Sequence, residues 1–160
     1  MNENKQRTVP PELLFSDYSL LFDSADEDVR LPVIVSGSSM SPFLKHNRDK
    51  VFLSRIESSP KRGDIILYRR SPKEFVLHRV YSVKNGAMTM VGDGQIYLEP
   101  DVPIERAEAI VSFVIRDGKK LSPSSPCWIF YEKIWLTLFP FRPVITKIHA
   151  FFKRKIKRND

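Results

Sequence analysis

Three short stretches of this chain carry residues that could perform acyl-transfer chemistry. The first is the turn Ser36-Gly37-Ser38-Ser39-Met40-Ser41-Pro42, which follows the apolar run 33–35. A small, hydroxyl-rich turn after a strand can hold a serine Oγ at the edge of a sheet, with neighbouring N–H groups free to face a developing oxyanion. Serine-glycine runs are also common in plain loops, so a nucleophile here needs a base elsewhere in the chain.

A candidate base lies in the second stretch, the apolar strand pattern Phe75–Val80, which contains His78. Strand alternation places His78 on the face opposite Arg79. Of the other two histidines, His46 falls in a charged loop and His149 in the C-terminal segment. His78 is therefore the histidine predicted on a rigid strand, where an imidazole could act as general base near neutral pH or could be an ordinary core residue.

The third stretch is the turn Gly92-Asp93-Gly94, with Glu99 six residues beyond the aspartate. A carboxylate close to a catalytic imidazole can orient the ring, fix its tautomer and stabilise the imidazolium that forms during the reaction. Asp93 and Glu99 are both candidates for this position, with a slight preference for Asp93. A Gly-Asp-Gly turn with a purely structural function is the alternative.

The elements that must position these residues are β-rich. Residues 31–115 alternate short apolar runs with turn residues, and Asn85-Gly86 between two apolar runs predicts a hairpin because both residues tolerate positive φ. Several strands at short spacing favour a twisted all-β core over alternating β-α units. The predicted strands are Val33–Ser36, Lys50–Ile56, Asp64–Arg70, Phe75–Val83, Ala87–Val91 and Ala109–Arg116.

Two flanking segments complete the predicted organisation of the 160 residues: 1–30, 31–120 and 121–160. Pro10-Pro11 and the apolar spacing up to Phe22 predict a short N-terminal helix, followed by an acidic connector. Beyond a linker at 121–126, aromatic and apolar residues interrupted by charges and prolines predict two short C-terminal helices. These helices could pack on the β core or lie in a membrane surface, and the basic terminal run favours the membrane surface.

In this order and spacing, the three stretches resemble the signal peptidase I and LexA-type serine peptidase superfamily over residues 31–117. The family's Gly-x-Ser-Met-x-Pro matches residues 37–42 and implies that Ser39 is the nucleophile. Its Gly-Asp-Ile strand matches 63–65, its base-bearing strand matches 77–80, and its Gly-Asp turn matches 92–93. Lysine-type members carry lysine at the position of His78, so the chain is similar to the histidine branch.

The resemblance also implies a fold and an oxyanion site. The implied fold is mainly β: a twisted, coiled antiparallel sheet core with a short N-terminal helix and C-terminal helices. Some family members have an oxyanion-donating serine at position 37, where this chain has glycine. Substrate binding and the oxyanion are therefore assigned to the backbone around Ser39, at Gly37, Ser38 and Met40. Glu99 stands where the histidine branch has a second aspartate, so the choice between Asp93 and Glu99 stays open.

Composition narrows the partners. The net charge is +7, concentrated in a basic run at 153–158, while residues 1–30 lean acidic. One cysteine excludes an internal disulfide, and the separated histidines and missing phosphate-binding glycine run give no support for a metal, a nucleotide or another cofactor. We expect no nucleic-acid partner, no cleavable signal peptide and no spanning helix, because no run of about 20 apolar residues occurs.

The sequence and the resemblance together predict a serine endopeptidase that cleaves an extended leader or signal peptide after a small residue. The expected location is the cytoplasm or the membrane surface, with residues 128–158 as the possible contact with the membrane. Two alternatives are a LexA-type self-cleaving regulator and a non-catalytic peptide-binding or membrane-associated relative. Residues 1–30 are too short and too acidic for a helix-turn-helix domain, which counts against the regulator.

Overall fold

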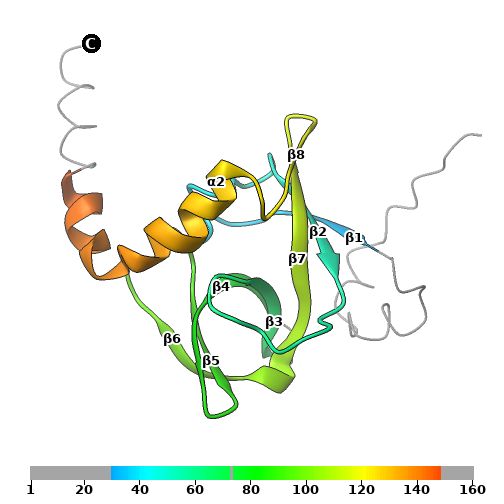
Figure 1. The fold of residues 1–160 in the computed structure, drawn as a ribbon, viewed down its shortest axis with the longest axis vertical. Helices are drawn as coiled ribbons and strands as arrows, with labels where there is room; N and C mark the ends of the chain where they lie inside the picture. The colour runs from blue at the N-terminus through cyan, green and yellow to red at the C-terminus, as the bar shows by residue number, and fades with distance from the viewer. Residues whose placement is uncertain (1–29, 73, 149–160) are drawn as a thin grey trace, which may run out of the picture.

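The computed structural model describes residues 30–72 and 74–148, which form one strongly curled antiparallel sheet with helices along one side (Figure 1). The sheet order is β1-β2-β7-β3-β4-β5-β6, with β8 paired to β7. The predicted mainly β class with C-terminal helices is confirmed, and the helix predicted near 10–22 lies outside the described residues. The strands are β1 (Leu31–Ile34), β2 (Lys50–Ser54), β3 (Ile65–Ser71), β4 (Glu74–Lys84), β5 (Ala87–Val91), β6 (Glu99–Pro103), β7 (Ala107–Arg116) and β8 (Lys119–Leu121).

Two hairpins of the sheet turn on residue pairs with positive φ. Asn85 and Gly86 have φ of 49° and 76°, and they join β4 to β5 as predicted. Asp117 and Gly118 have φ of 49° and 75° and join β7 to β8, a hairpin that the sequence analysis did not predict. Both pairs suit the mirror-image turns whose twist matches that of the flanking strands.

The predicted strand β5 has the observed bounds, while β1 starts and ends two residues earlier than expected. β6 and β8 were missed. Pro100 and Pro103 made the β6 segment look unlike a strand, yet β6 ends the sheet order, where a missing N–H donor is tolerated. β8 is only three residues long, too short to show an alternating pattern.

The core has two parts because β3 is buried on both faces. Ile65 and Leu67 belong to one cluster, which also contains Phe43 from the turn after β1. Ile66 and Tyr68 belong to the other, together with Val80, Met88, Met90 and Val102. Alternation along one strand therefore distributes its side chains between the two clusters.

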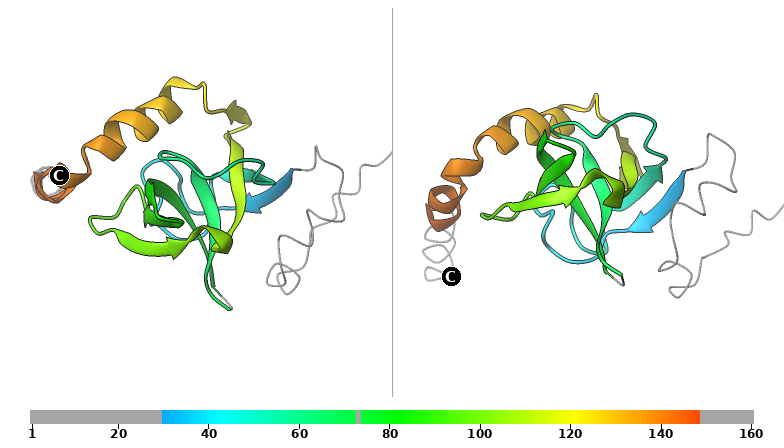
Figure 2. Two further views of the ribbon diagram at one scale, coloured as in Figure 1. Left: turned by 60° about the horizontal axis from the view of Figure 1, so that its bottom comes forward. Right: turned by 90° about the horizontal axis from the view of Figure 1, so that it is seen from below.

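The C-terminal segment is continuous with this core. It forms a helix over 126–137, which includes α2 (Pro126–Ile129) and a π-helical turn Phe130–Trp135, and a second helix over 142–148. A 3₁₀ turn, Phe139–Phe141, separates them at Pro140, and the helices run along the outside of the curled sheet (Figure 2). Trp128 is buried and meets the Phe43 ring edge-on at 5.4 Å between centroids. No helix among the described residues is long and apolar enough to cross a membrane.

Candidate active site

Ser39 and His78 line the same cavity, which has a volume of about 350 Å³. Ser39 belongs to the turn that follows β1, and His78 lies in the middle of β4. Among the described residues no hydrogen bond joins the two side chains; in enzymes such bonds often tighten only when substrate is bound. The rest of the wall is mostly apolar and is formed largely by Val33, Val35, Val51, Leu53, Leu67, Phe75, Val76 and Leu77.

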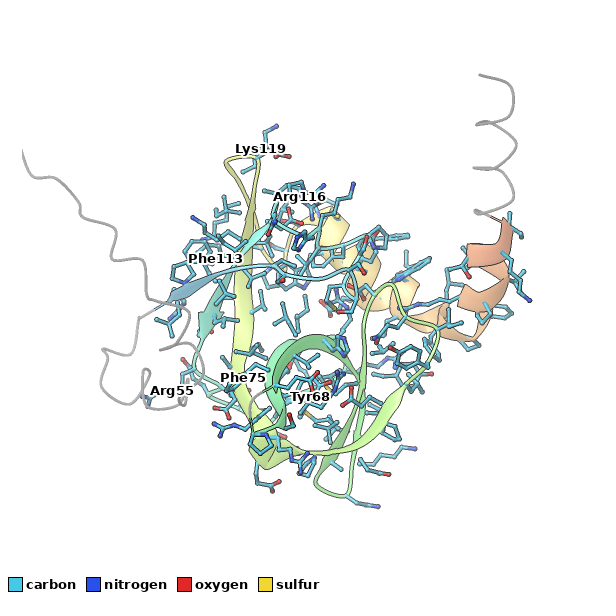
Figure 3. The ribbon with its side chains drawn as sticks, turned by 180° about the vertical axis from the view of Figure 1, so that it is seen from behind. Arg55, Tyr68, Phe75, Phe113, Arg116 and Lys119 are labelled. Atoms are coloured by element: carbon cyan, nitrogen blue, oxygen red, sulfur yellow. The ribbon has the colours of Figure 1, made fainter. Side chains whose placement is uncertain are left out.

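The hydroxyl of Tyr68 contacts the imidazole of His78. The imidazole is 2% exposed, and its Nδ1 lies 3.3 Å from the Tyr68 hydroxyl, which in turn donates to Glu99 Oε2 at 2.7 Å. Tyr68 is fully buried on β3 and lies inside the curve of the sheet (Figure 3). Glu99 Oε2 is 4.0 Å from His78 Nδ1, so the tyrosine hydroxyl connects the carboxylate to the ring.

This connection fixes the histidine tautomer. A tyrosine has one hydroxyl proton and an ionised carboxylate can only accept, so Tyr68 donates to Glu99 and accepts the Nδ1 proton of His78. The Nε2 atom then carries the lone pair. The tautomer is the one that a general base for Ser39 requires.

Electrostatics keep His78 uncharged. Burial and the nearby Arg70 guanidinium lower the pKa of His78 to about 4, although Glu99 acts in the opposite direction. For Glu99, burial raises the pKa, but the hydrogen bonds from Arg70 and Tyr68 outweigh it and lower the net pKa. The site therefore combines a neutral imidazole, a protonated tyrosine and a carboxylate at neutral pH, as the tautomer assignment needs.

Asp93 does not lie beside His78. Its two carboxylate oxygens accept from Arg79 Nε at 3.0 Å and Arg79 Nη2 at 2.8 Å, and both side chains are fully buried. Arg79 Nη1 also donates to the Gly63 carbonyl. Both Asp93 oxygens are therefore engaged by Arg79, whose side chain lies on the opposite face of β4 from His78. The structure places Glu99, and not Asp93, near the imidazole.

The Gly92-Asp93-Gly94 turn instead supports the nucleophile turn. The Gly94 N–H donates to the Ser39 carbonyl at 2.8 Å. A Cβ atom at Gly92 would lie 2.4 Å from that same carbonyl oxygen, and one at Gly94 would lie 2.6 Å from the Ser41 carbonyl oxygen. Glycine is required at both positions because the two backbones approach so closely.

The predicted oxyanion residues have different surroundings. Gly37 lines the cavity, but its N–H donates to His46 Nδ1 at 3.1 Å. Ser38 is exposed and lies outside the cavity lining, whereas Met40 is buried and lines it. Within the described part of the chain, the N–H groups of Ser39 and Met40 donate to no other residue. The candidate oxyanion donors therefore narrow to these two backbone N–H groups.

The C-terminal helices contact the site at the Gly92-Asp93-Gly94 turn. Trp135 Nε1 donates to the Asp93 carbonyl at 2.8 Å, and Arg142 Nη1 donates to the carbonyls of Gly92 and Gln95 at 2.9 and 3.0 Å. Arg142 is 1% exposed, so this contact lies inside the protein. Burial lowers the pKa of Arg142, although Asp93 acts in the opposite direction.

Sequence reasoning missed Tyr68, Arg70, Trp135 and Arg142 as parts of the site. Alternation on the predicted strand 64–70 could have placed Tyr68 and Arg70 on one face, but only strand pairing brings Tyr68 near His78. No group of three or more possible metal-ligating side chains occurs in residues 30–72 and 74–148.

Comparison of the chain with models of protein families, with curated proteins and with solved structures finds no match.

Proposed function

We propose that this chain is a serine endopeptidase of the signal-peptidase type, with Ser39 as nucleophile and His78 as general base. The observation that carries the proposal is the shared cavity, whose lining includes both a serine and a buried, neutral histidine of defined tautomer. The order of the matching motifs and the curled antiparallel sheet both support this class. A fold of the LexA and signal peptidase type is part of the same proposal.

In the proposed reaction, Nε2 of His78 takes the proton from Ser39 Oγ as the oxygen attacks the peptide carbonyl. The oxyanion accepts from the N–H groups of Ser39 and Met40. The protonated imidazole then gives its proton to the departing amine, which leaves an acyl ester on Ser39. Water, deprotonated by His78, hydrolyses the ester and restores both side chains.

The proposed substrate is an extended leader or signal peptide. Among the described strands β1 is the first in the sheet order and pairs only with β2, so its other edge can accept a peptide strand. Val33 and Val35 of this region line the cavity with Leu77, and no acidic side chain lines it. An uncharged residue before the cleaved bond suits such a wall, and the preference for a small one is taken from the family resemblance.

The test is hydrolysis of a peptide library by the full chain, followed by mass spectrometry. We expect cleavage after small residues, and Ser39→Ala and His78→Ala should each lower kcat by about a thousandfold or more. Ser124→Ala, which changes an exposed serine in the loop after β8, is the matched control and should keep full activity. A fluorophosphonate should label Ser39.

Hydrolysis that survives in Ser39→Ala would overturn the proposal. A folded chain that neither cleaves peptides nor reacts with the fluorophosphonate would favour the non-catalytic peptide-binding alternative. Loss of the intact mass on incubation of the pure chain alone would favour self-cleavage.

A further inference from the structure

The C-terminal helices expose most of the large apolar side chains found on the described surface. Six of the nine such residues lie within 129–148, with exposed fractions of 39% to 61%. We define them as the C-terminal apolar face: Ile129, Phe130, Ile134, Phe141, Val144 and Ile148. Exposed apolar residues gathered in this way mark a surface that meets a partner or a membrane.

The same helices are fixed to the protein on their other side. Trp128 and Leu136 are buried, and Arg142 and Trp135 hold the glycine turn of the candidate active site. The exposed side chains follow helical spacing: Phe130 and Ile134 are four residues apart, and Phe141, Val144 and Ile148 are three and four apart. The segment therefore has two sides: one packs on the core of the protein, and the other carries the C-terminal apolar face.

Charge indicates which partner suits this face. Lys133 and Lys147 are exposed on the same two helices, and the chain continues with five basic residues between 153 and 158. Apolar side chains beside lysines and arginines match the boundary between acyl chains and anionic headgroups. A nucleic acid would match the charges and leave the apolar side chains in water, so an anionic lipid surface accounts for both features.

We propose that the C-terminal apolar face binds the surface of an anionic membrane, with the helices lying in its plane. Because Trp135 and Arg142 join these helices to the turn that supports Ser39, binding also fixes the orientation of the cavity relative to the lipid. Membrane binding does not rest on the peptidase proposal, since it involves neither Ser39 nor His78.

The test is sedimentation of the full chain with vesicles, using equal parts phosphatidylglycerol and phosphatidylcholine, and phosphatidylcholine alone. We expect binding to the anionic vesicles and at least about tenfold weaker binding to phosphatidylcholine or in 0.5 M NaCl. Val144→Glu and Phe141→Glu should each weaken binding by about tenfold, because each places a charge where an apolar side chain enters the lipid.

Ile34→Glu is the matched control. Ile34 is 60% exposed against 57% for Val144, the change in charge is the same, and β1 lies at the far side of the protein from these helices (Figures 1 and 2). It should bind vesicles as the wild type does. Circular dichroism should show that all three variants are folded.

Three results would overturn the proposal: no binding to anionic vesicles, equal loss of binding in Ile34→Glu and Val144→Glu, or self-association through the apolar face with no lipid binding. Because binding is measured without a substrate, a catalytically inactive chain can still pass this test, and an active peptidase can still fail it.

Discussion

Two arginine–carboxylate pairs lie on opposite faces of β4. They differ in how deeply they are buried and in which part of the candidate site they contact. Arg79 and Asp93 are both 0% exposed and join the strand to the turn beneath Ser39. The side chains of Arg70 and Glu99 are 36% and 25% exposed, and this pair adjoins the Tyr68 hydroxyl behind His78. The first pair joins β4 to the turn that contacts Ser39. The second lies beside the proposed base, where Arg70 lowers and Glu99 raises the pKa of His78, in addition to the larger effect of burial.

The difference follows from desolvation. Two fully buried charges are tolerated only when nearly all their hydrogen bonds are satisfied, and Arg79 achieves this with both Asp93 oxygens and the Gly63 carbonyl. A partly solvated pair has a smaller desolvation cost and a smaller effect on stability. Its two charges act in opposite directions on the neighbouring buried imidazole, whose pKa Arg70 lowers and Glu99 raises.

The largest expected effect is on stability. Asp93→Asn should lower the free energy of unfolding by about 3–5 kcal/mol, because it leaves the Arg79 guanidinium buried without its counter-ion. Glu99→Gln, the matched carboxylate-to-amide change, should cost about 1 kcal/mol. Urea denaturation followed by tryptophan fluorescence measures both. Equal losses in the two variants would show that the pairs do not have separate functions.

Tyr68→Phe should lower kcat by about ten- to a hundredfold while leaving the fold intact. The phenyl ring keeps the packing in the second core cluster, but the hydroxyl that accepts the Nδ1 proton is lost, so His78 no longer has a fixed tautomer. Peptide hydrolysis measures kcat, and thermal unfolding shows whether the fold is intact. Tyr131→Phe, which changes a tyrosine outside the cavity lining, is the control and should keep kcat. An unchanged kcat in Tyr68→Phe would remove the tyrosine from the proposed mechanism.

Arg70→Met should have the smallest effect, confined to acidic pH. Arg70 lowers the pKa of His78, so its removal moves that pKa up from about 4, and a protonated imidazole cannot accept the Ser39 proton. We expect the acid limb of kcat/KM to move to higher pH, with activity at pH 5 falling by between about two- and tenfold and activity at pH 8 unchanged. If the acid limb of kcat/KM stays in place or moves to lower pH, Arg70 is not a cause of the lowered pKa of His78.

Much of the fold follows from local patterns. Alternation and the Asn85-Gly86 pair gave β4 and β5, and Pro140 marked the break between the two C-terminal helices. β6 was missed because its prolines oppose strand formation and only its place at the end of the sheet permits them. The proposed membrane contact was expected from composition, but which helix side would be exposed depended on the burial of Trp128 and Leu136.

By itself, the sequence determined the candidate nucleophile and base, since Ser39 and His78 lie in short motifs whose chemistry depends on residue type and local order. The tertiary structure decided which acid lies near the candidate base. Asp93 and Glu99 look alike as carboxylates near a turn, and only strand pairing shows that one faces Arg79 and the other faces Tyr68. The physical reason is that hydrogen bonds and charge interactions act over a few ångströms in space, between residues that can be far apart in the chain, as Tyr68 and Glu99 are at 31 positions.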